Sequence, residues 1–446
     1  MRCLLMVLLT CLSLPAWAGG TTAFVNVNVV PMDKDGIVSQ QTVVVRDGAI
    51  VAVGPVDDVP IPEDAHVVDG TDRYLLPGLA EMHAHVPDAN TPEMERYFAL
   101  YVANGVTTIR GMLGRPSHLE LREDLATGRT FGPRLVTSGP SLNGRSVNGA
   151  EQARQMVRAQ HAAGYDFIKI HPGLSRDEFE AAAATANELD MPFAGHVPVA
   201  VGVRRALQLG IATIDHLDGY FAELLPKNSD GEGGYGGFFG VFLADDIDPE
   251  QLASIARETA AAGTWNVPTE VLVEQLVDTT PVAELRSRPE MRYMPEETVE
   301  GWADAKREQL AERGYDPGVA MLAVELRRRL IIEMHRAGAG LLLGSDSPQI
   351  FNVPGFATHR ELDALVAAGL SPYEALRTGT AAVAEFLGTN TGIVAVGRDA
   401  DLVLLDADPL EDITNARRVH GVVVRGEWYP ATELDERIAP YRRGRQ

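Results

Sequence analysis

The middle of the chain alternates between helix-like segments and short apolar strands, and this repeat limits the possible folds more than any other feature. The segment "GAEQARQMVRAQHAAG" is followed by "YDFIKIH", "SRDEFEAAAATANELD" by "MPFAGHV", and "PVAVGVRRALQLG" by "IATIDHLDG". Each helix-like segment ends near a glycine or another turn residue, as helices commonly do. Helices that alternate with single apolar strands indicate a parallel β-sheet with helical crossovers.

The repeat continues along most of the chain. Strands are expected near residues 78–85, 106–110, 134–138, 166–171, 193–197, 211–216, 264–269 and 340–346. Eight strands, each followed by a helix or by an insertion that contains one, predict an α/β fold built on a (β/α)8 TIM barrel. The connections 217–248 and 270–318 are long, and long loops in such folds often cover a functional site. Whether the Gly-rich segment 229–240 forms a lid stays open.

Both ends of the chain carry β-strand patterns. The segments "TAFVNVNVV" and "QTVVVRDGAIVAVG" lie near one end, and "GIVAVGRDADLVLLDADP" and "RRVHGVVVRGEWY" lie near the other. Asp47-Gly48 has the composition of a hairpin turn. We therefore predict a small β-sandwich built from residues 19–76 and 390–446, with the barrel domain at 77–389 between them.

The first eighteen residues, "MRCLLMVLLTCLSLPAWA", have the pattern of a signal peptide. An apolar run too short to span a bilayer follows one arginine, and Ala16-Trp17-Ala18 matches the A-x-A cleavage pattern. We expect cleavage after Ala18 and an exported protein, periplasmic or secreted; a lipoprotein processed at Cys11 fits less well. Both cysteines, Cys3 and Cys11, lie in this segment, so the exported chain would contain no disulfide and no thiolate ligand.

Composition narrows the range of partners. The net charge of −23 disfavours binding to the phosphate backbone of nucleic acids, which needs clustered Lys and Arg. Hydrophobic residues make up 45% of the chain and charged residues 23%, as in soluble globular proteins. We expect a small-molecule substrate, no nucleic acid and no membrane span; a homo-oligomer is compatible with the sequence.

Side chains that bind metals gather where the expected barrel strands end. His83 and His85 end the first strand and, at positions i and i+2, point to the same side of it. The fourth, fifth, sixth and eighth strands end at or near Lys169, His196, His216 and Asp346. Functional residues of parallel barrels collect at the C-terminal ends of the strands, so we predict one site for a divalent metal there.

Each of these residues, taken alone, also has an ordinary structural explanation. A His-x-His pair arises by chance roughly 0.3 times in a chain with this many histidines. A lysine in "DFIKI" could extend out of its strand, and "GSDSP" could be a capped turn. The coincidence of all six residues at the strand ends of one barrel favours the metal site.

Together these motifs resemble the amidohydrolase superfamily. The likeness is carried by "LLPGLAEMHAH", the lysine of the fourth strand, "GHV", "DHLDG", "GSDSP" and "GRDADLVLLDADPLEDI". It covers nearly all of the chain after residue 18. The nearest likeness is to the branch that contains imidazolonepropionases and prolidase-like metal-dependent dipeptidases.

The resemblance implies two divalent metal ions, zinc by default, with Lys169 carboxylated on its side-chain nitrogen. An ammonium cannot bind a cation, whereas a carbamate can bridge two. A metal-bound water would lose a proton near neutral pH, and Asp346 would be the catalytic residue that moves that proton to the leaving group. The implied ligands are His83, His85, Lys169 and Asp346 for one metal and Lys169, His196 and His216 for the other.

Four further residues are candidate substrate contacts: His171, Arg110, Arg145 and Tyr220. His171 faces the same way as Lys169, and either arginine could bind a carboxylate. The resemblance implies a hydrolase of C–N bonds, with dipeptides or N-acyl amino acids as expected substrates. The alternatives are a lactone, ester or cyclic-amide hydrolase with the same site, or a non-catalytic binding protein with this fold. The exact substrate and the metal identity stay open.

Overall fold

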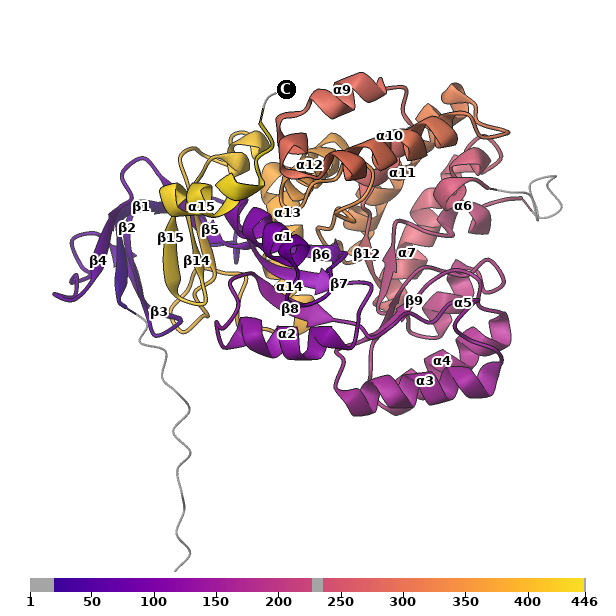
Figure 1. Cartoon of the computed structure of the whole chain (residues 1–446), viewed down its shortest axis with the longest axis horizontal. Coiled ribbons are helices and arrows are strands. Elements are labelled where there is room, and N and C mark those ends of the chain that lie inside the picture. The colour runs from indigo at the N-terminus through magenta and orange to yellow at the C-terminus, as the bar shows by residue number, and fades with distance from the viewer. Residues whose placement is uncertain (1–19, 227–235, 445–446) are drawn as a thin grey trace, which may run out of the picture.

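The computed structural model describes residues 20–226 and 236–444. The expected signal peptide and most of the Gly-rich segment lie outside these residues. Figure 1 shows two β regions side by side, with most of the helices packed around the second one. One is an eight-stranded sheet, and the other consists of two parallel sheets with four and three strands.

The eight-stranded sheet takes strands from both ends of the described chain. The order β15-β14-β13-β5-β1-β2-β3 places the C-terminal β13 directly against the N-terminal β5, and β4 pairs with β1. The hairpin between β2 and β3 turns at Asp47 and Gly48, whose φ angles of 50° and 81° are left-handed, as a tight turn of this kind requires. The strands are β1 (Thr22–Val29), β2 (Val38–Arg46), β3 (Ala49–Pro55), β4 (His66–Asp69), β5 (Tyr74–Pro77), β13 (Leu402–Leu405), β14 (Val419–Val424) and β15 (Glu427–Pro430).

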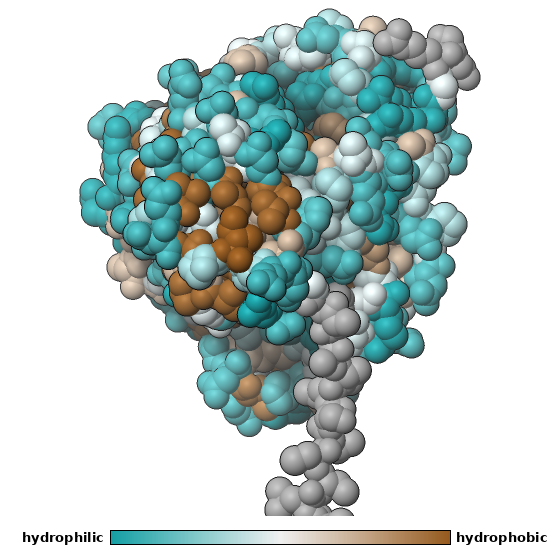
Figure 2. All heavy atoms as spheres, turned by 90° about the vertical axis from the view of Figure 1, so that its left-hand side faces the viewer, coloured by the Kyte–Doolittle hydropathy of each residue, from teal (hydrophilic) through white to brown (hydrophobic). Residues whose placement is uncertain are grey.

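Figure 2 looks onto the end of the molecule that carries this sheet and shows apolar side chains gathered on a face that is otherwise hydrophilic. Val51 of β3 and Val67 of β4 are 43% and 53% exposed, and Val396, in the loop before β13, is 61% exposed. The side chains on the opposite side of the sheet are buried, and there Phe24 of β1 packs edge-to-face on Trp428 of β15.

The second region contains seven of the eight expected barrel strands, all paired in parallel. Where the eighth was expected, at 340–346, only single parallel bridges occur, from Leu341 to Asn266 and from Ser347 to Ala84. Asp346 lies at a left-handed φ of 58°, which interrupts a regular strand. The strands are β6 (Leu79–Ala84), β7 (Val106–Gly111) and β8 (Arg134–Thr137) in one sheet, and β9 (Ile168–Ile170), β10 (Phe193–Gly195), β11 (Thr213–Asp215) and β12 (Trp265–Val267) in the other.

The helices between these strands begin and end where local sequence directs them. Ser175 and Glu178 form a reciprocal capping box at the start of α4, and Gly164 closes α3 in the left-handed conformation. The α-helices are α1 (Pro92–Ala103), α2 (Ser117–Ala126), α3 (Ala150–Ala163), α4 (Arg176–Glu188), α5 (Val203–Gln208), α6 (Tyr220–Glu223), α7 (Leu252–Ala262), α8 (Glu270–Val277), α9 (Val282–Ser287), α10 (Glu296–Leu310), α11 (Pro317–Ala337), α12 (Phe356–Ala367), α13 (Pro372–Thr378), α14 (Ala381–Leu387) and α15 (Ala431–Ile438). The short 3₁₀ helices are η1 (Phe238–Leu243), η2 (Pro249–Gln251), η3 (Pro289–Tyr293), η4 (Ile413–Arg417) and η5 (Ala439–Tyr441).

Helices bury their apolar faces against the parallel strands. Phe179 of α4 packs edge-to-face on Phe193 of β10, with ring centroids 5.9 Å apart, and both side chains are fully buried. Among the residues described, no helix combines the length and apolar character that a membrane crossing requires.

A histidine in this core makes stability depend on pH. His359 of α12 is buried and shares a 2.9 Å hydrogen bond with the carbonyl of Asn104, and burial followed by the charge of Arg417 lowers its pKa from 6.5 to about 4. The unfolded chain therefore binds more protons than the folded chain between these pH values, so stability is lost as pH falls. The expected loss from this residue is about 3 kcal/mol.

We expect His359→Gln, which keeps a donor but does not titrate, to lose about 3 kcal/mol less than the native protein between pH 6.5 and pH 4. Urea titrations at the two pH values measure the difference in unfolding free energy. Equal losses in the two proteins would mean that His359 is protonated as readily in the folded state as in the unfolded one.

Candidate active site

A cavity of about 850 Å³ opens where the parallel strands end. Five of the six side chains expected to bind metal line it, namely His83, His85, His196, His216 and Asp346. They come from the ends of β6, β10 and β11 and from the bridged segment after Leu341. The sixth, Lys169 of β9, is fully buried, and its strand pairs in parallel with β10.

His83, His85 and Asp346 form a cluster that could hold a metal ion. One ligand atom from each lies within 4.8 Å of the others. The Nε2 atom of His85 is 2.7 Å from the Oδ1 atom of Asp346, and the Nε2 atom of His83 is 3.7 Å from it. The parallel bridge between Ala84 and Ser347 brings the two chain segments together.

His196 and His216 stand next to this cluster. The ring centroids of His216 and His83 are 4.4 Å apart, and those of His216 and His196 are 4.8 Å apart. Burial and the neighbouring positive groups lower the pKa of His83 and of His216 well below the ordinary value. Both imidazoles are therefore neutral at neutral pH, which is the form that binds metals.

Lys169 lies beneath these histidines without a hydrogen-bond partner. Its side chain is 0% exposed, its Nζ atom makes no hydrogen bond in the described part of the chain, and its nearest carboxylate, from Asp215, is 3.9 Å away. Burial lowers its pKa from 10.5 to about 8. An unsatisfied buried ammonium is costly, whereas a carboxylated lysine beside divalent metals would satisfy the same position, so the donor set fits two metals.

Three side chains behind the cavity lining face the Nδ1 atoms of three of the imidazoles. The Nδ1 atom of His83 lies 2.9 Å from Asp215, and the Nδ1 atom of His196 lies 3.0 Å from Asp218. The Nδ1 atom of His216 shares a 2.8 Å hydrogen bond with Thr269. In each case the Nε2 atom is left for a metal, which is the usual arrangement at metal sites.

Two of these residues stand on strained backbone. His216 and Thr269 have left-handed φ angles of 64° and 47°, which non-glycine residues rarely adopt. The buried guanidinium of Arg327 holds this region by donating to the carbonyls of His216 and Pro268 and to the carboxylate of Glu270. Strain fixed by such a network is a mark of functional sites.

Arg110 does not line the cavity, although the sequence suggested it as a substrate contact. It is 1% exposed and donates to the carbonyl of Met82, to Thr213 and to Asp215. A guanidinium that is buried and fully engaged has no donor for a substrate. Its place in the structure is to hold Asp215, which in turn faces His83.

The other candidate substrate contacts lie in different settings. Tyr220 is fully buried and bonds through its hydroxyl to Thr259 and Asn266, so it does not face the cavity. His171 lines the cavity and stacks on His196 with ring centroids 5.1 Å apart. Burial, then the charge of Lys169, lowers the pKa of His171 to about 2, so it is neutral at neutral pH. Arg145 lies on an adjoining hollow that shares His171 with the cavity.

One wall of the cavity is apolar. Phe238 and Phe239 of η1 line it, and the ring of Phe239 stacks flat on His216, with centroids 4.5 Å apart and an angle of 2°. Phe239 adopts a left-handed φ of 53°, which is rare for an aromatic residue. An apolar or aromatic group could pack against this wall.

The orienting residues were missed from the sequence, although Asp215 and Asp218 flank His216 in "TIDHLDG". Their closeness to His216 in the sequence is the one signal that could have indicated a role beside the metal ligands. Gln349 was missed as well; its side-chain amide donates to Asp346 over 3.1 Å and lies 3.1 Å from His85.

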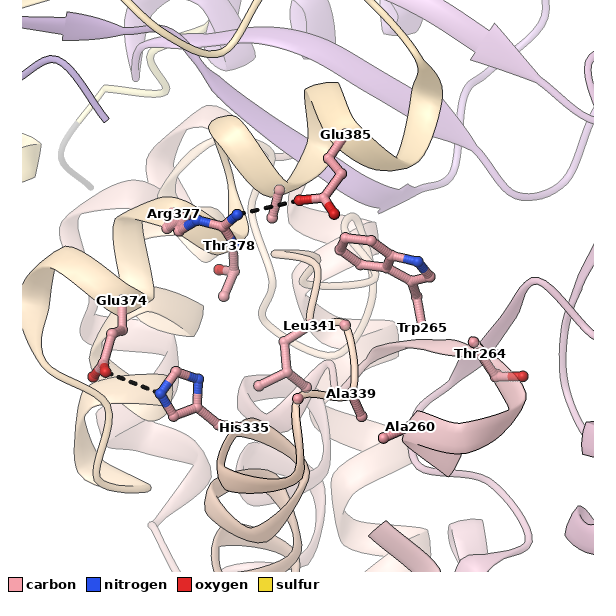
Figure 3. A pocket seen from close by; sticks show the side chains of 14 residues that line it. Ala260, Thr264, Trp265, His335, Ala339, Leu341, Glu374, Arg377, Thr378 and Glu385 are labelled. Atoms are coloured by element: carbon pink, nitrogen blue, oxygen red, sulfur yellow. Dashed lines mark hydrogen bonds and ion pairs between the residues drawn. The ribbon is translucent and has the colours of Figure 1, made fainter. Parts of the chain in front are cut away.

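A second hollow, of about 320 Å³, lies at the opposite end of the strands, where Trp265 begins β12. Figure 3 shows its two charged pairs, His335 with Glu374 and Arg377 with Glu385. Within each pair the two side chains are partners of each other. None of the candidate metal ligands lines this second hollow.

Replacing Asp218, the hydrogen-bond partner of His196, tests whether the residues behind the histidines contribute to metal binding. Asp218 is partly exposed and, among the described residues, pairs with no arginine or lysine, so Asp218→Ala should fold normally. We expect its affinity for a divalent metal to fall about 10- to 100-fold, because His196 loses the group that orients it. Competition with a chromogenic chelator measures the affinity, and the exposed Asp58→Ala is the matched control. Unchanged affinity would show that His196 needs no partner or binds no metal.

Comparisons with known proteins show which family and which solved structures this chain resembles. A family model described as "Amidohydrolase family" matches residues 74–429. A bottromycin amidohydrolase structure is similar with a TM-score of 0.74 and 24% identity, over 94% of this chain and 90% of that one. A putative prolidase from Bifidobacterium longum is similar with a TM-score of 0.68 and 26% identity, over 95% and 99%. Among curated proteins, the imidazolonepropionase of Idiomarina loihiensis is 36% identical over 64 residues, which are 14% of this chain and 16% of that enzyme's length.

Proposed function

Because this chain belongs to the amidohydrolase family, we propose that it is an exported, binuclear metal-dependent hydrolase that cleaves the amide bond of dipeptides or N-acyl amino acids. The observation that carries the proposal is Lys169. Its buried nitrogen has no hydrogen-bond partner in the described chain, and a carbamate formed there would be a ligand that two metal ions can share. The likeness to a putative prolidase supports the substrate class.

We propose that the parallel strands close into a (β/α)8 barrel at residues 77–389, beside a β-sandwich formed by 19–76 and 390–446. Three parallel contacts support closure. Ser138 bridges to Phe167 between the two parallel sheets, Asn266 bridges to Leu341, and Ala84 bridges to Ser347. The export signal at residues 1–18 is part of the proposal and is tested by finding the chain in the periplasm or the medium, beginning at Gly19.

The residues present fit two metal ions, which we take as zinc. His83, His85 and Asp346 would hold one ion, His196 and His216 the other, and N6-carboxylated Lys169 would join them. When bound, such ions acidify a coordinated water and polarise the substrate carbonyl. The neutral, oriented imidazoles described above are ready for this role without loss of a proton.

Asp346 is the group placed to move the proton. Its Oδ1 atom faces His85 and accepts from Gln349, whereas its Oδ2 atom accepts no hydrogen bond within the described residues. Oδ2, which lies 3.8 Å from the Nδ1 atom of His216, would accept the proton of the attacking water and deliver it to the leaving nitrogen. Gln349 holds the carboxylate in place, and Phe239 covers one side of the site against water.

A library of dipeptides and N-acyl amino acids, offered to zinc-loaded protein, tests the proposal. Release of free amino acid that requires zinc is the expected result. Activity on lactones, esters or cyclic amides in place of these substrates would select the alternative reaction, and the short match to imidazolonepropionase makes cyclic amides the first of these to examine. Binding without turnover of any of these substrates would indicate a non-catalytic binding protein.

A further inference from the structure

A shallow hollow of about 540 Å³ adjoins the active-site cavity. The loop that follows β8 forms one side of it with Asn143, Gly144 and Arg145, and the segment after β9 forms the other side with His171 and Pro172. His171 and Pro172 also line the active-site cavity. His171, which lines the hollow together with Arg145, stacks on the candidate metal ligand His196 with ring centroids 5.1 Å apart.

Arg145 is exposed, and its guanidinium has no hydrogen bond or ion pair within residues 20–226 and 236–444. The other arginines near the site are engaged: Arg110 bonds to Asp215, and Arg204 pairs with Glu223 and Glu258. The protein has 62 acidic and 39 basic residues, so carboxylates are abundant. An arginine left unpaired beside the site in such a chain has its full set of donors free for a ligand.

The backbone beneath this arginine is fixed. The side chain of Asn143 accepts from the backbone N–H groups of Arg145 and Ser146 over 2.8 and 3.0 Å. Gly144 donates to the carbonyl of Pro172, and a Cβ atom on Gly144 would lie 2.5 Å from the carbonyl oxygen of Gly173. The loop is therefore held closely against the cavity wall, and a guanidinium on a fixed loop loses less freedom on binding.

The cavity offers an anion no other cationic side chain. Among its described lining residues there is no lysine or arginine. Two of the carboxylates that line the cavity are already paired, Asp218 with His196 and Glu223 with Arg204. Among the described residues, the unpaired cationic side chain that a substrate carboxylate could reach is therefore Arg145, in the hollow beside His171.

We propose that Arg145 binds the carboxylate of the substrate and thereby determines specificity for acids over their amides. This inference rests on the proposed function, because the same substrate must reach the cavity. The apolar wall of Phe238 and Phe239 lies in the cavity itself and not on this hollow, so a ligand would present its apolar group there and its carboxylate to Arg145. N-acetylphenylalanine has both features.

The test compares binding of N-acetylphenylalanine and N-acetylphenylalaninamide to the zinc-loaded Asp346→Asn protein by calorimetry. We expect the acid to bind about 10- to 100-fold more tightly than the amide, as a charge-assisted bidentate pair allows. Arg145→Gln, added to this protein, should remove most of the preference, and Arg145→Lys should keep part of it. Arg154→Gln is the control, since Arg154 is exposed, pairs with Glu151 and lines no cavity described above.

Equal binding of the two probes, or a preference that survives Arg145→Gln, would overturn the inference, and so would a failure of the acid to bind. The library assay with native protein tests the proposed function separately. If native protein hydrolyses acids and amides equally, the function stands and the role of Arg145 falls. If it hydrolyses nothing while the acid still binds through Arg145, the function falls and the carboxylate site stands.

Discussion

Asp346→Asn should lower kcat for amide hydrolysis about 10³- to 10⁴-fold while the protein keeps most of its bound metal. The carboxylate has one oxygen turned to His85 and Gln349 and the other without a hydrogen bond in the described chain. Asparagine keeps the size of the side chain and one oxygen but cannot accept a proton at neutral pH. Loss of a positioned base typically costs up to about 10⁴-fold in rate.

The measurement is kcat on the best substrate of the library, together with metal content by elemental analysis. Asp58→Asn, on an exposed loop, controls for the loss of one negative charge. A variant that keeps more than about a tenth of kcat would show that the proton moves through another group. A variant that loses all metal would assign Asp346 to metal binding alone.

Lys169→Met should lower both the metal content of the protein and kcat, and this is the second large effect that we expect. We expect the variant to hold about one metal equivalent less than the native protein and to lose at least about 10³-fold in kcat. Methionine has nearly the length of lysine and suits a buried site, so the metal-free variant should be as stable as the native protein or more so. The reason is that Lys169 is 0% exposed with no hydrogen bond to its nitrogen in the described residues.

Incubation with ¹³C-labelled bicarbonate and zinc, followed by ¹³C NMR, tests carboxylation directly. A carbamate signal in the native protein that is missing in Lys169→Met is the expected result. Lys169→Arg is the matched control, since it keeps a positive charge but forms no bridging carbamate. Full activity in Lys169→Met would show that the lysine is structural.

The regular repeat made the parallel strands and the candidate ligands predictable. Seven strands lie where the alternation of helix and apolar segment indicated, and His83, His85, His196, His216 and Asp346 line one cavity. Local signals suffice here because parallel strands bring their C-terminal ends to the same edge wherever they occur in the chain. The eighth segment makes only isolated bridges among the described residues, and Asp346 at its end has a left-handed φ of 58° that its sequence did not indicate.

Contacts between distant residues could not be predicted in this way. Arg110 and Asp215 belong to β7 and β11, and nothing in either segment shows that they pair inside the protein. Tyr220 and Phe239 are aromatic residues of the same long connection, yet only Phe239 faces the cavity. Which aromatic residue turns inward depends on how that connection folds, and its sequence has no regular period.

The pairing of Pro77 with Leu402 in the eight-stranded sheet has a consequence for the timing of folding. Strands β1 to β5 leave the ribosome early, but β13 to β15 arrive only after the parallel strands β6 to β12 and their helices have been synthesised. The sheet therefore cannot be completed on a partly made chain, and its early strands keep an open hydrogen-bonding edge until late. The eight-stranded sheet, although it begins near the first described residue, is therefore among the last parts of the protein to be completed.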